Sequence, residues 1–79
     1  MNTTITWRNH TISLGDDAEY VYRSHIHGMQ CTEPDNWIHV TGYDVNESET
    51  YYHVWYYVPD KNTELDSIDY ENYSDIEMI

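Results

Sequence analysis

Residues 50–58 form a run of aromatic and β-branched side chains that is broken only by His53. Such residues favour β-strands, in which successive side chains point to opposite faces of a sheet. One face of this strand would carry Tyr52, Val54, Tyr56 and Val58, and the other Tyr51, His53, Trp55 and Tyr57. Neither set resembles the charged face that a strand normally exposes to water. We therefore expect a strand whose faces are covered, at least on one side, by another part of the chain or by a partner.

Shorter alternating segments predict further strands. Residues 3–7 and 11–14 indicate an N-terminal hairpin, and residues 18–27 give the clearest single strand. Residues 37–41 are expected to pair with the aromatic strand across the acidic connection 44–49, whereas residues 29–36 are expected to form a loop because Pro34 and the Asp-Asn pair after it interrupt regular structure. The residues expected to supply much of the core are Trp7, Ile12, Tyr22, Ile38, Val54 and Trp55.

The composition changes after Pro59. The last twenty residues hold seven acidic residues and one lysine, a net charge of −6. Residues 63–66 resemble a helix N-terminus with acids in the first turn, and Leu65, Ile68, Asn72 and Ile76 follow a helical stripe. The alternatives are a final strand over residues 75–79, or a tail that becomes ordered only on binding.

Together these patterns predict a mainly β or α+β fold: a small antiparallel sheet of about four or five strands, with a short C-terminal helix as an option. A chain of 79 residues has room for one domain, residues 1–79, with the acidic segment 60–79 packed on it or partly ordered. The single cysteine, Cys31, excludes an intramolecular disulfide. No secretory signal or membrane-spanning apolar run is present, so we expect a cytoplasmic protein without membrane attachment.

The charge balance is strongly acidic, with 15 Asp and Glu against 3 Lys and Arg and a formal net charge of −12. Carboxylates with so few internal partners repel one another, which destabilises a small domain unless an external partner makes use of them. Direct binding to nucleic acid is not expected, because phosphates would repel this chain. The expected partner is therefore a basic protein.

Acidic residues recur beside tyrosines, for example in residues 17–20, 43–44, 49–51 and 69–75. Carboxylates at alternate strand positions lie about 6–7 Å apart, a spacing comparable to that of neighbouring phosphates. Tyrosine adds rigid contact area that tolerates water at one end. Such a surface suits a basic groove built for nucleic acid. The candidate partner-binding residues are Glu47, Glu49, Glu64, Asp66, Asp69, Tyr70, Glu71, Tyr73 and Asp75.

In length, charge excess, β-rich pattern and the acidic run over residues 64–71, the chain resembles the small acidic nucleic-acid mimics of phages and mobile elements. These include anti-CRISPR proteins, anti-restriction proteins and inhibitors of uracil-DNA glycosylase. The resemblance is one of type. It implies a monomeric or homodimeric, stoichiometric inhibitor that acts in the host cytoplasm on a nucleic-acid-binding defence complex. A CRISPR effector is the preferred target, because such complexes carry extended basic channels.

Two other interpretations stay open. A protein from a salt-rich cytoplasm carries acidic residues without any mimicry, and would spread them evenly over its surface. A small regulatory or assembly subunit would instead use the aromatic strand, residues 51–57, to pair with another chain through exposed strand edges.

Neither catalysis nor metal binding is expected from the sequence. No G-x-S-x-G, G-x-x-x-x-G-K or H-E-x-x-H motif occurs, so we expect no enzyme. His25, His27, Cys31, His39 and His53 are residue types that bind zinc, but the paired spacing of a structural zinc site is missing. We therefore expect no cofactor and no metal site, and we expect chelators to leave the fold unchanged.

Overall fold

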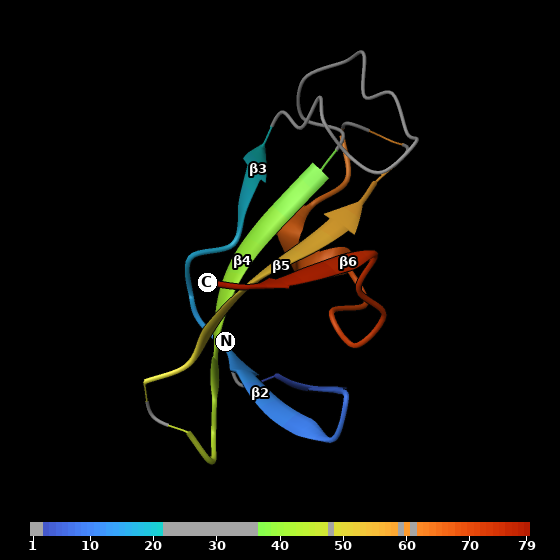
Figure 1. The fold of residues 1–79 in the computed structure, drawn as a ribbon. Coiled ribbons are helices and arrows are strands. Elements are labelled where there is room, and N and C mark those ends of the chain that lie inside the picture. Colours follow the sequence, from blue (N-terminus) through green and yellow to red (C-terminus); the bar gives the residue numbers. More distant parts are fainter. Residues whose placement is uncertain (1–2, 22–36, 48, 59, 61) are drawn as a thin grey trace.

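The computed structural model describes residues 3–21, 37–47, 49–58, 60 and 62–79, and these residues are mainly β. They form the strands β1 (Thr4–Trp7), β2 (His10–Leu14), β3 (Glu19–Val21), β4 (Trp37–Asp44), β5 (Tyr51–Tyr57) and β6 (Asp75–Met78), with one 3-10 turn, η1 (Leu65–Ser67) (Figure 1). Every strand pair is antiparallel, and the sheet curves into a half-barrel. The fold class predicted from the sequence is confirmed.

The strand order is β1-β2-β4-β5-β6, with β3 paired to β4 beside β2. The β4–β5 ladder is the longest and runs from the pair Trp37–Tyr57 to the pair Tyr43–Tyr51. Strand β5 is therefore interior, because β4 and β6 use both of its backbone edges. The hypothesis that β5 pairs with another chain through an exposed edge is wrong for this reason.

The core lies on the inner face of the curved sheet. Its buried residues are Ile5, Ile12, Leu14, Ile38, Val40, Tyr52, Val54, Tyr56 and Val58. The predicted core positions Ile12, Ile38 and Val54 are confirmed, whereas Trp7 and Trp55 are only half-buried. Trp55 neighbours Val54 along β5 and so points to the opposite face. Tyr22, also predicted for the core, lies outside the described residues.

A two-residue turn joins β1 to β2. Both of its residues have positive φ angles, 47° at Arg8 and 66° at Asn9. Tight hairpins use such turns because the turn twist matches the twist of the strands. The predicted N-terminal hairpin is thereby confirmed, with His10 placed as the first residue of β2.

Strand β2 pairs with the end of β4, from Gly42 to Asp44. A Cβ atom added at Gly42 would lie 2.5 Å from Ile12 Cγ2 and 3.4 Å from Leu14 Cδ2. The absence of a side chain at this position therefore lets Ile12 and Leu14 pack directly onto the backbone of β4. This close approach holds the N-terminal hairpin against the β4–β5 turn.

The segment between β5 and β6 folds back over the inner face. The helix considered for this segment is reduced to η1, because the backbone is already extended at Ile68, with φ −86° and ψ 141°. Ile68 and Tyr70 both pack against the core, and residues two apart cannot share one face of a helix. The alternative of a final strand is confirmed in β6.

The third predicted strand is described only in part. Strand β3 covers Glu19–Val21, and the remainder of the predicted strand, together with the predicted loop 29–36, lies outside the described residues.

Candidate functional site

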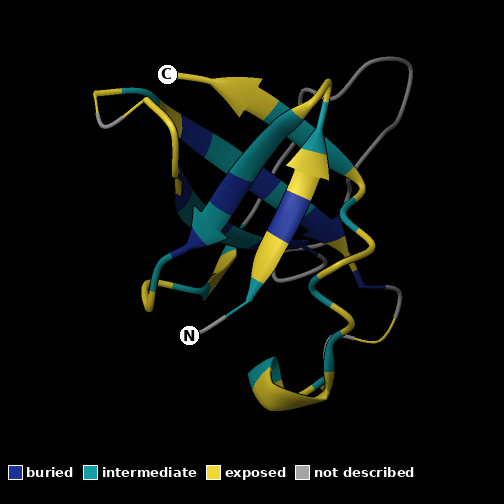
Figure 2. Ribbon diagram, turned by 90° about the horizontal axis from the view of Figure 1, so that it is seen from below, coloured by how far each residue is buried: buried dark blue, intermediate teal, exposed yellow. Residues whose placement is uncertain are grey.

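Most acidic residues that the structure describes are exposed. Exposed positions are common in the turns and in the segment between β5 and β6, whereas buried positions lie mainly in the strands (Figure 2). Asp75 is half-buried and Asp44 is buried. The eleven exposed acids are Asp16, Asp17, Glu19, Glu47, Glu49, Asp60, Glu64, Asp66, Asp69, Glu71 and Glu77. Arg8 is the only lysine or arginine that the structure describes, and its guanidinium lies over the Trp7 ring, 4.8 Å from the ring centroid. The surface of the described residues is therefore dominated by carboxylates.

The predicted partner-binding acids fall into two groups rather than one. Glu64, Asp66, Asp69 and Glu71 are exposed in the segment that follows β5, which we call the acidic loop (residues 60 and 62–74). Glu47 and Glu49 lie in the β4–β5 turn at the other end of β5 (Figure 1). A seven-residue strand is about 20 Å long, so the two groups do not form one patch.

Asp75 belongs to neither group. It lies in β6, directly opposite Trp55 of β5, and is half-buried. Its backbone position is set by the β5–β6 ladder, so Asp75 is part of the sheet rather than of the acidic loop.

The two tyrosines predicted to contact a partner are half-buried and anchor the acidic loop. The Tyr70 hydroxyl donates a hydrogen bond to the Leu65 carbonyl at 2.6 Å, and the Tyr56 hydroxyl donates to the Tyr70 carbonyl at 2.8 Å. The Tyr73 hydroxyl donates to the Thr6 carbonyl of β1 at 3.1 Å. Burial raises the pKa of Tyr70, so its hydroxyl stays protonated and able to donate. The exposed carboxylates thus belong to a segment whose backbone is connected to the core and to β1 by tyrosine hydrogen bonds.

Exposed tyrosines lie instead at the two ends of the β4–β5 ladder, on its outer face. Tyr43 and Tyr51 face each other across the ladder and are 46% and 48% exposed, and Tyr57 is 43% exposed. The sequence pattern predicted that Tyr51 and Tyr57 share a face of one strand. The addition of Tyr43 follows from the register of β4 against β5, which the sequence does not contain.

The same register brings two histidines together. His39 Nε2 and His53 Nδ1 are 2.7 Å apart, and the His39 ring lies 4.5 Å from the Trp55 ring. One imidazole must donate to the other, so at least one of the pair is neutral in this arrangement. The two histidines lie on separate strands, β4 and β5, and the β4–β5 ladder brings their rings into contact. His25, His27 and Cys31 lie outside the described residues.

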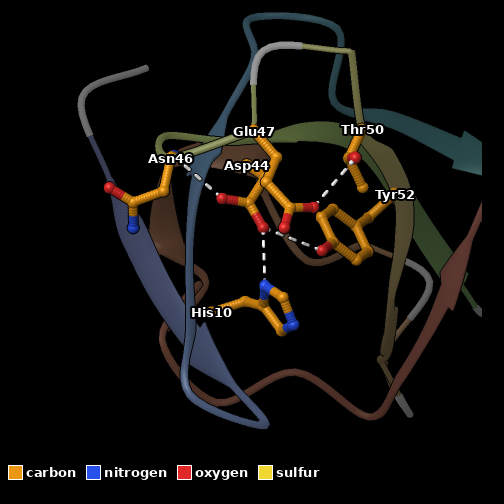
Figure 3. A network of polar contacts seen from close by, with 6 residues as sticks. All are labelled: His10, Asp44, Asn46, Glu47, Thr50 and Tyr52. Carbon is orange, nitrogen blue, oxygen red and sulfur yellow. Dashed lines mark hydrogen bonds and ion pairs between the residues drawn. The ribbon is translucent and has the colours of Figure 1, made fainter.

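A second polar cluster surrounds the buried carboxylate of Asp44 (Figure 3). Asp44 Oδ2 lies 2.7 Å from His10 Nδ1 and accepts a hydrogen bond from the Tyr52 hydroxyl at 3.1 Å. Asp44 Oδ1 accepts the Asn46 backbone N–H at 2.9 Å. The Asn46 hydrogen bond, together with those from His10 and Tyr52, outweighs burial and holds the pKa of Asp44 below its ordinary value. The buried group is therefore a carboxylate.

Glu47 completes this cluster. One ligand atom each from His10, Asp44 and Glu47 lie within 4.8 Å of one another, the only such group of three metal-ligating side chains among the described residues. The sequence predicts only a partner-binding role for Glu47. His10 and Asp44 are 34 positions apart and no local pattern connects them, so only the pairing of β2 with β4 reveals the cluster.

No family model matches the chain, and no curated protein or solved structure is significantly similar to it. Among the described residues, no helix has the length and apolar character needed to cross a membrane. Function is therefore inferred from the surface and the side-chain clusters themselves.

Proposed function

We propose that this protein is a stoichiometric inhibitor that occupies the basic groove of a nucleic-acid-binding protein in place of DNA or RNA. The observation that supports this most strongly is the acidic surface, because eleven exposed carboxylates accompany Arg8 as the only described lysine or arginine. The resemblance to acidic anti-defence proteins makes a host defence complex the favoured target. Within that class we favour a guide-RNA effector, whose channels bind nucleic-acid backbones.

The acidic loop is the contact surface that we favour. It carries five exposed acids, Asp60, Glu64, Asp66, Asp69 and Glu71. Its backbone is held at several points by the tyrosine hydrogen bonds described above, which reduces the conformational freedom that would be lost on binding. Surfaces that are ordered before binding lose less affinity to ordering than flexible ones. The anchoring of the loop therefore supports a role for its carboxylates in recognition.

Electrostatic attraction would guide the encounter. A negative surface that approaches a groove lined with lysine and arginine associates faster at low ionic strength, and salt screens this field over about 8–10 Å. A single exposed charge contributes little by itself. Inhibition should thus depend on several carboxylates at once. Because phosphates repel the same surface, the partner is a protein and not nucleic acid.

A second candidate function is that of a regulatory or assembly subunit, and the outer sheet face favours it. Tyr43 and Tyr51 form an exposed aromatic pair there. Tyrosine is common in protein interfaces because it adds large contact area with few rotors to freeze. This candidate places the contact on the opposite side of the sheet from the acidic loop, so the two functions can be separated by mutation.

The test compares two sets of charge reversals with equal change in net charge. The loop variant is Glu64→Lys, Asp66→Lys and Glu71→Lys, and the matched control is Asp16→Lys, Glu19→Lys and Glu77→Lys. All six positions are exposed. Asp69 is left intact because its carboxylate accepts the Glu71 backbone N–H and shapes the turn. Both variants should retain the circular dichroism spectrum of the wild type.

Binding to a panel of purified guide-RNA effectors would be measured at low and moderate salt. We expect the loop variant to lose at least about tenfold in affinity, and the control variant to lose much less, since only the loop enters the groove. Equal losses in both variants would show that net charge alone matters. Unchanged binding of the loop variant, with loss on Tyr43→Ala and Tyr51→Ala, would favour the second candidate.

A further inference from the structure

The Asp44 cluster joins two parts of the chain that are distant in sequence. His10 begins β2 in the N-terminal hairpin, Asp44 ends β4, and Glu47 follows in the β4–β5 turn. Figure 3 shows the two carboxylates, the His10 imidazole and the Tyr52 hydroxyl converging on one small region. His10 Nδ1 and Asp44 Oδ2 are already 2.7 Å apart, and the Glu47 carboxylate lies within 4.8 Å of both.

The two carboxylates and the imidazole are close enough for one cation to contact all three. The Asp44 side chain is 0% exposed, and its polar contacts within the described residues are an imidazole, a phenol and a backbone amide. The Glu47 carboxylate reaches the same region, because one of its oxygens lies within 4.8 Å of the ligand atoms of Asp44 and His10. A buried carboxylate beside a second one is costly unless a cation or a proton compensates it.

We propose that His10, Asp44 and Glu47 together bind one divalent transition-metal ion of the zinc class. Imidazole nitrogen and carboxylate oxygen are typical zinc ligands, with bond lengths of about 2.0–2.2 Å. Calcium and magnesium prefer sets made of oxygen alone, so the nitrogen of His10 selects against them. The ion replaces the proton between Nδ1 and Oδ2, the two atoms move apart from their present 2.7 Å to admit it, and His10 then carries its proton on Nε2.

The surrounding residues orient the ligands as metal sites require. The Asn46 backbone N–H and the Tyr52 hydroxyl donate to the Asp44 carboxylate, and the Thr50 hydroxyl donates to Glu47 Oε2 at 3.2 Å. Hydrogen bonds of this kind fix ligand orientation, and their loss commonly weakens metal binding. Glu47 is exposed and the His10 side chain is 35% exposed, which leaves a path for the ion and a coordination position for water.

The proposed site would stabilise the fold by linking the N-terminal hairpin to the β4–β5 turn. A ligand that binds only the folded state raises its stability as the ligand concentration increases. The site lies at the end of β5 opposite the acidic loop, and it needs no partner protein. Its test is therefore independent of the inhibitor function proposed above.

The experiment is titration of untagged, EDTA-treated protein with zinc alone, followed by isothermal calorimetry and by the melting temperature. The variants are Glu47→Gln, His10→Gln and the matched control Glu49→Gln, which removes the same charge from the same turn. Calcium serves as a comparison ion. A fourth variant, His39→Gln, tests the other histidine cluster.

We expect one zinc ion per chain for the wild type and for Glu49→Gln, a melting temperature that rises with zinc, and no response to calcium. Glu47→Gln and His10→Gln should each weaken zinc binding at least about tenfold. The absence of binding by the wild type would overturn the proposal, as would equal binding by Glu47→Gln and Glu49→Gln. Loss of binding only in His39→Gln would place the ion at the His39–His53 pair and overturn it as well.

Discussion

Replacement of Gly42 by alanine should push β2 away from β4. The new Cβ atom would lie 2.5 Å from Ile12 Cγ2, well inside van der Waals contact, and 3.4 Å from Leu14 Cδ2. Gly42 does not have a left-handed backbone, so the cost is steric rather than conformational. Overpacking of this kind costs about 1–3 kcal/mol, against a gain of about 0.4–1 kcal/mol from the lower entropy of the unfolded chain. The steric cost is larger than the entropic gain, so we expect Gly42→Ala to lower the free energy of unfolding by about 1–2 kcal/mol.

A double-mutant cycle with Ile12→Ala tests this reasoning, with the free energy of unfolding measured by urea denaturation. Ile12 is fully buried, so Ile12→Ala alone should cost about 2–5 kcal/mol. This change removes Cγ2, so Gly42→Ala should then be neutral or stabilising, because the added methyl group fills part of the cavity. The two changes should thus be non-additive by at least about 1 kcal/mol. Additive costs would refute the close approach of β2 to β4 at this point.

Three further predictions concern the hairpin, the loop anchor and acid stability. Asn9→Gly should raise the free energy of unfolding by up to about 1 kcal/mol, because glycine adopts the positive φ at no steric cost; Asn9→Ala should lower it in the same urea assay. Tyr73→Phe removes the hydrogen bond to the Thr6 carbonyl and should cost about 0.5–1.5 kcal/mol, with faster amide exchange in the acidic loop. Partial burial acts to raise the pKa of Asp17, but hydrogen bonds with Thr41 outweigh it and hold this pKa below 3.8. The resulting stabilisation is present above pH 3.8 and is lost as the pH falls through the folded-state pKa, so Asp17→Asn should flatten the stability profile in that range.

The sequence predicts the strands well because alternation is a local property. It could not decide which face of β5 enters the core, since both faces carry large aromatic side chains and neither carries an acidic residue, a lysine or an arginine. That choice depends on the segment after β5, which covers only one face. The same segment also explains why the predicted C-terminal helix does not form. Ile68 and Tyr70 both pack against the core, and residues two apart do not lie on one side of a helix.

The side-chain clusters could not be predicted for a different reason. The pairing of β2 with β4 brings His10 into contact with Asp44, and the pairing of β4 with β5 brings His39 into contact with His53. No short segment of sequence encodes the register of these strand pairs. The acidic loop shows the opposite case. Its charge density is plain in the sequence, but the inward direction of Tyr70 and Tyr73 depends on the edge-on contact of the Tyr70 ring with Tyr56 and on the hydrogen bond from Tyr73 to Thr6.

Competition between this protein and DNA for one binding site is the most direct test of the central claim. Fluorescently labelled target DNA would be bound to a purified guide-RNA effector, and anisotropy followed as this protein is added. We expect DNA to be displaced at one protein per effector, with an apparent affinity that weakens as more DNA is added and as salt is raised. A ternary complex in which DNA and this protein bind the effector together, with no mutual effect on affinity, would contradict nucleic-acid mimicry.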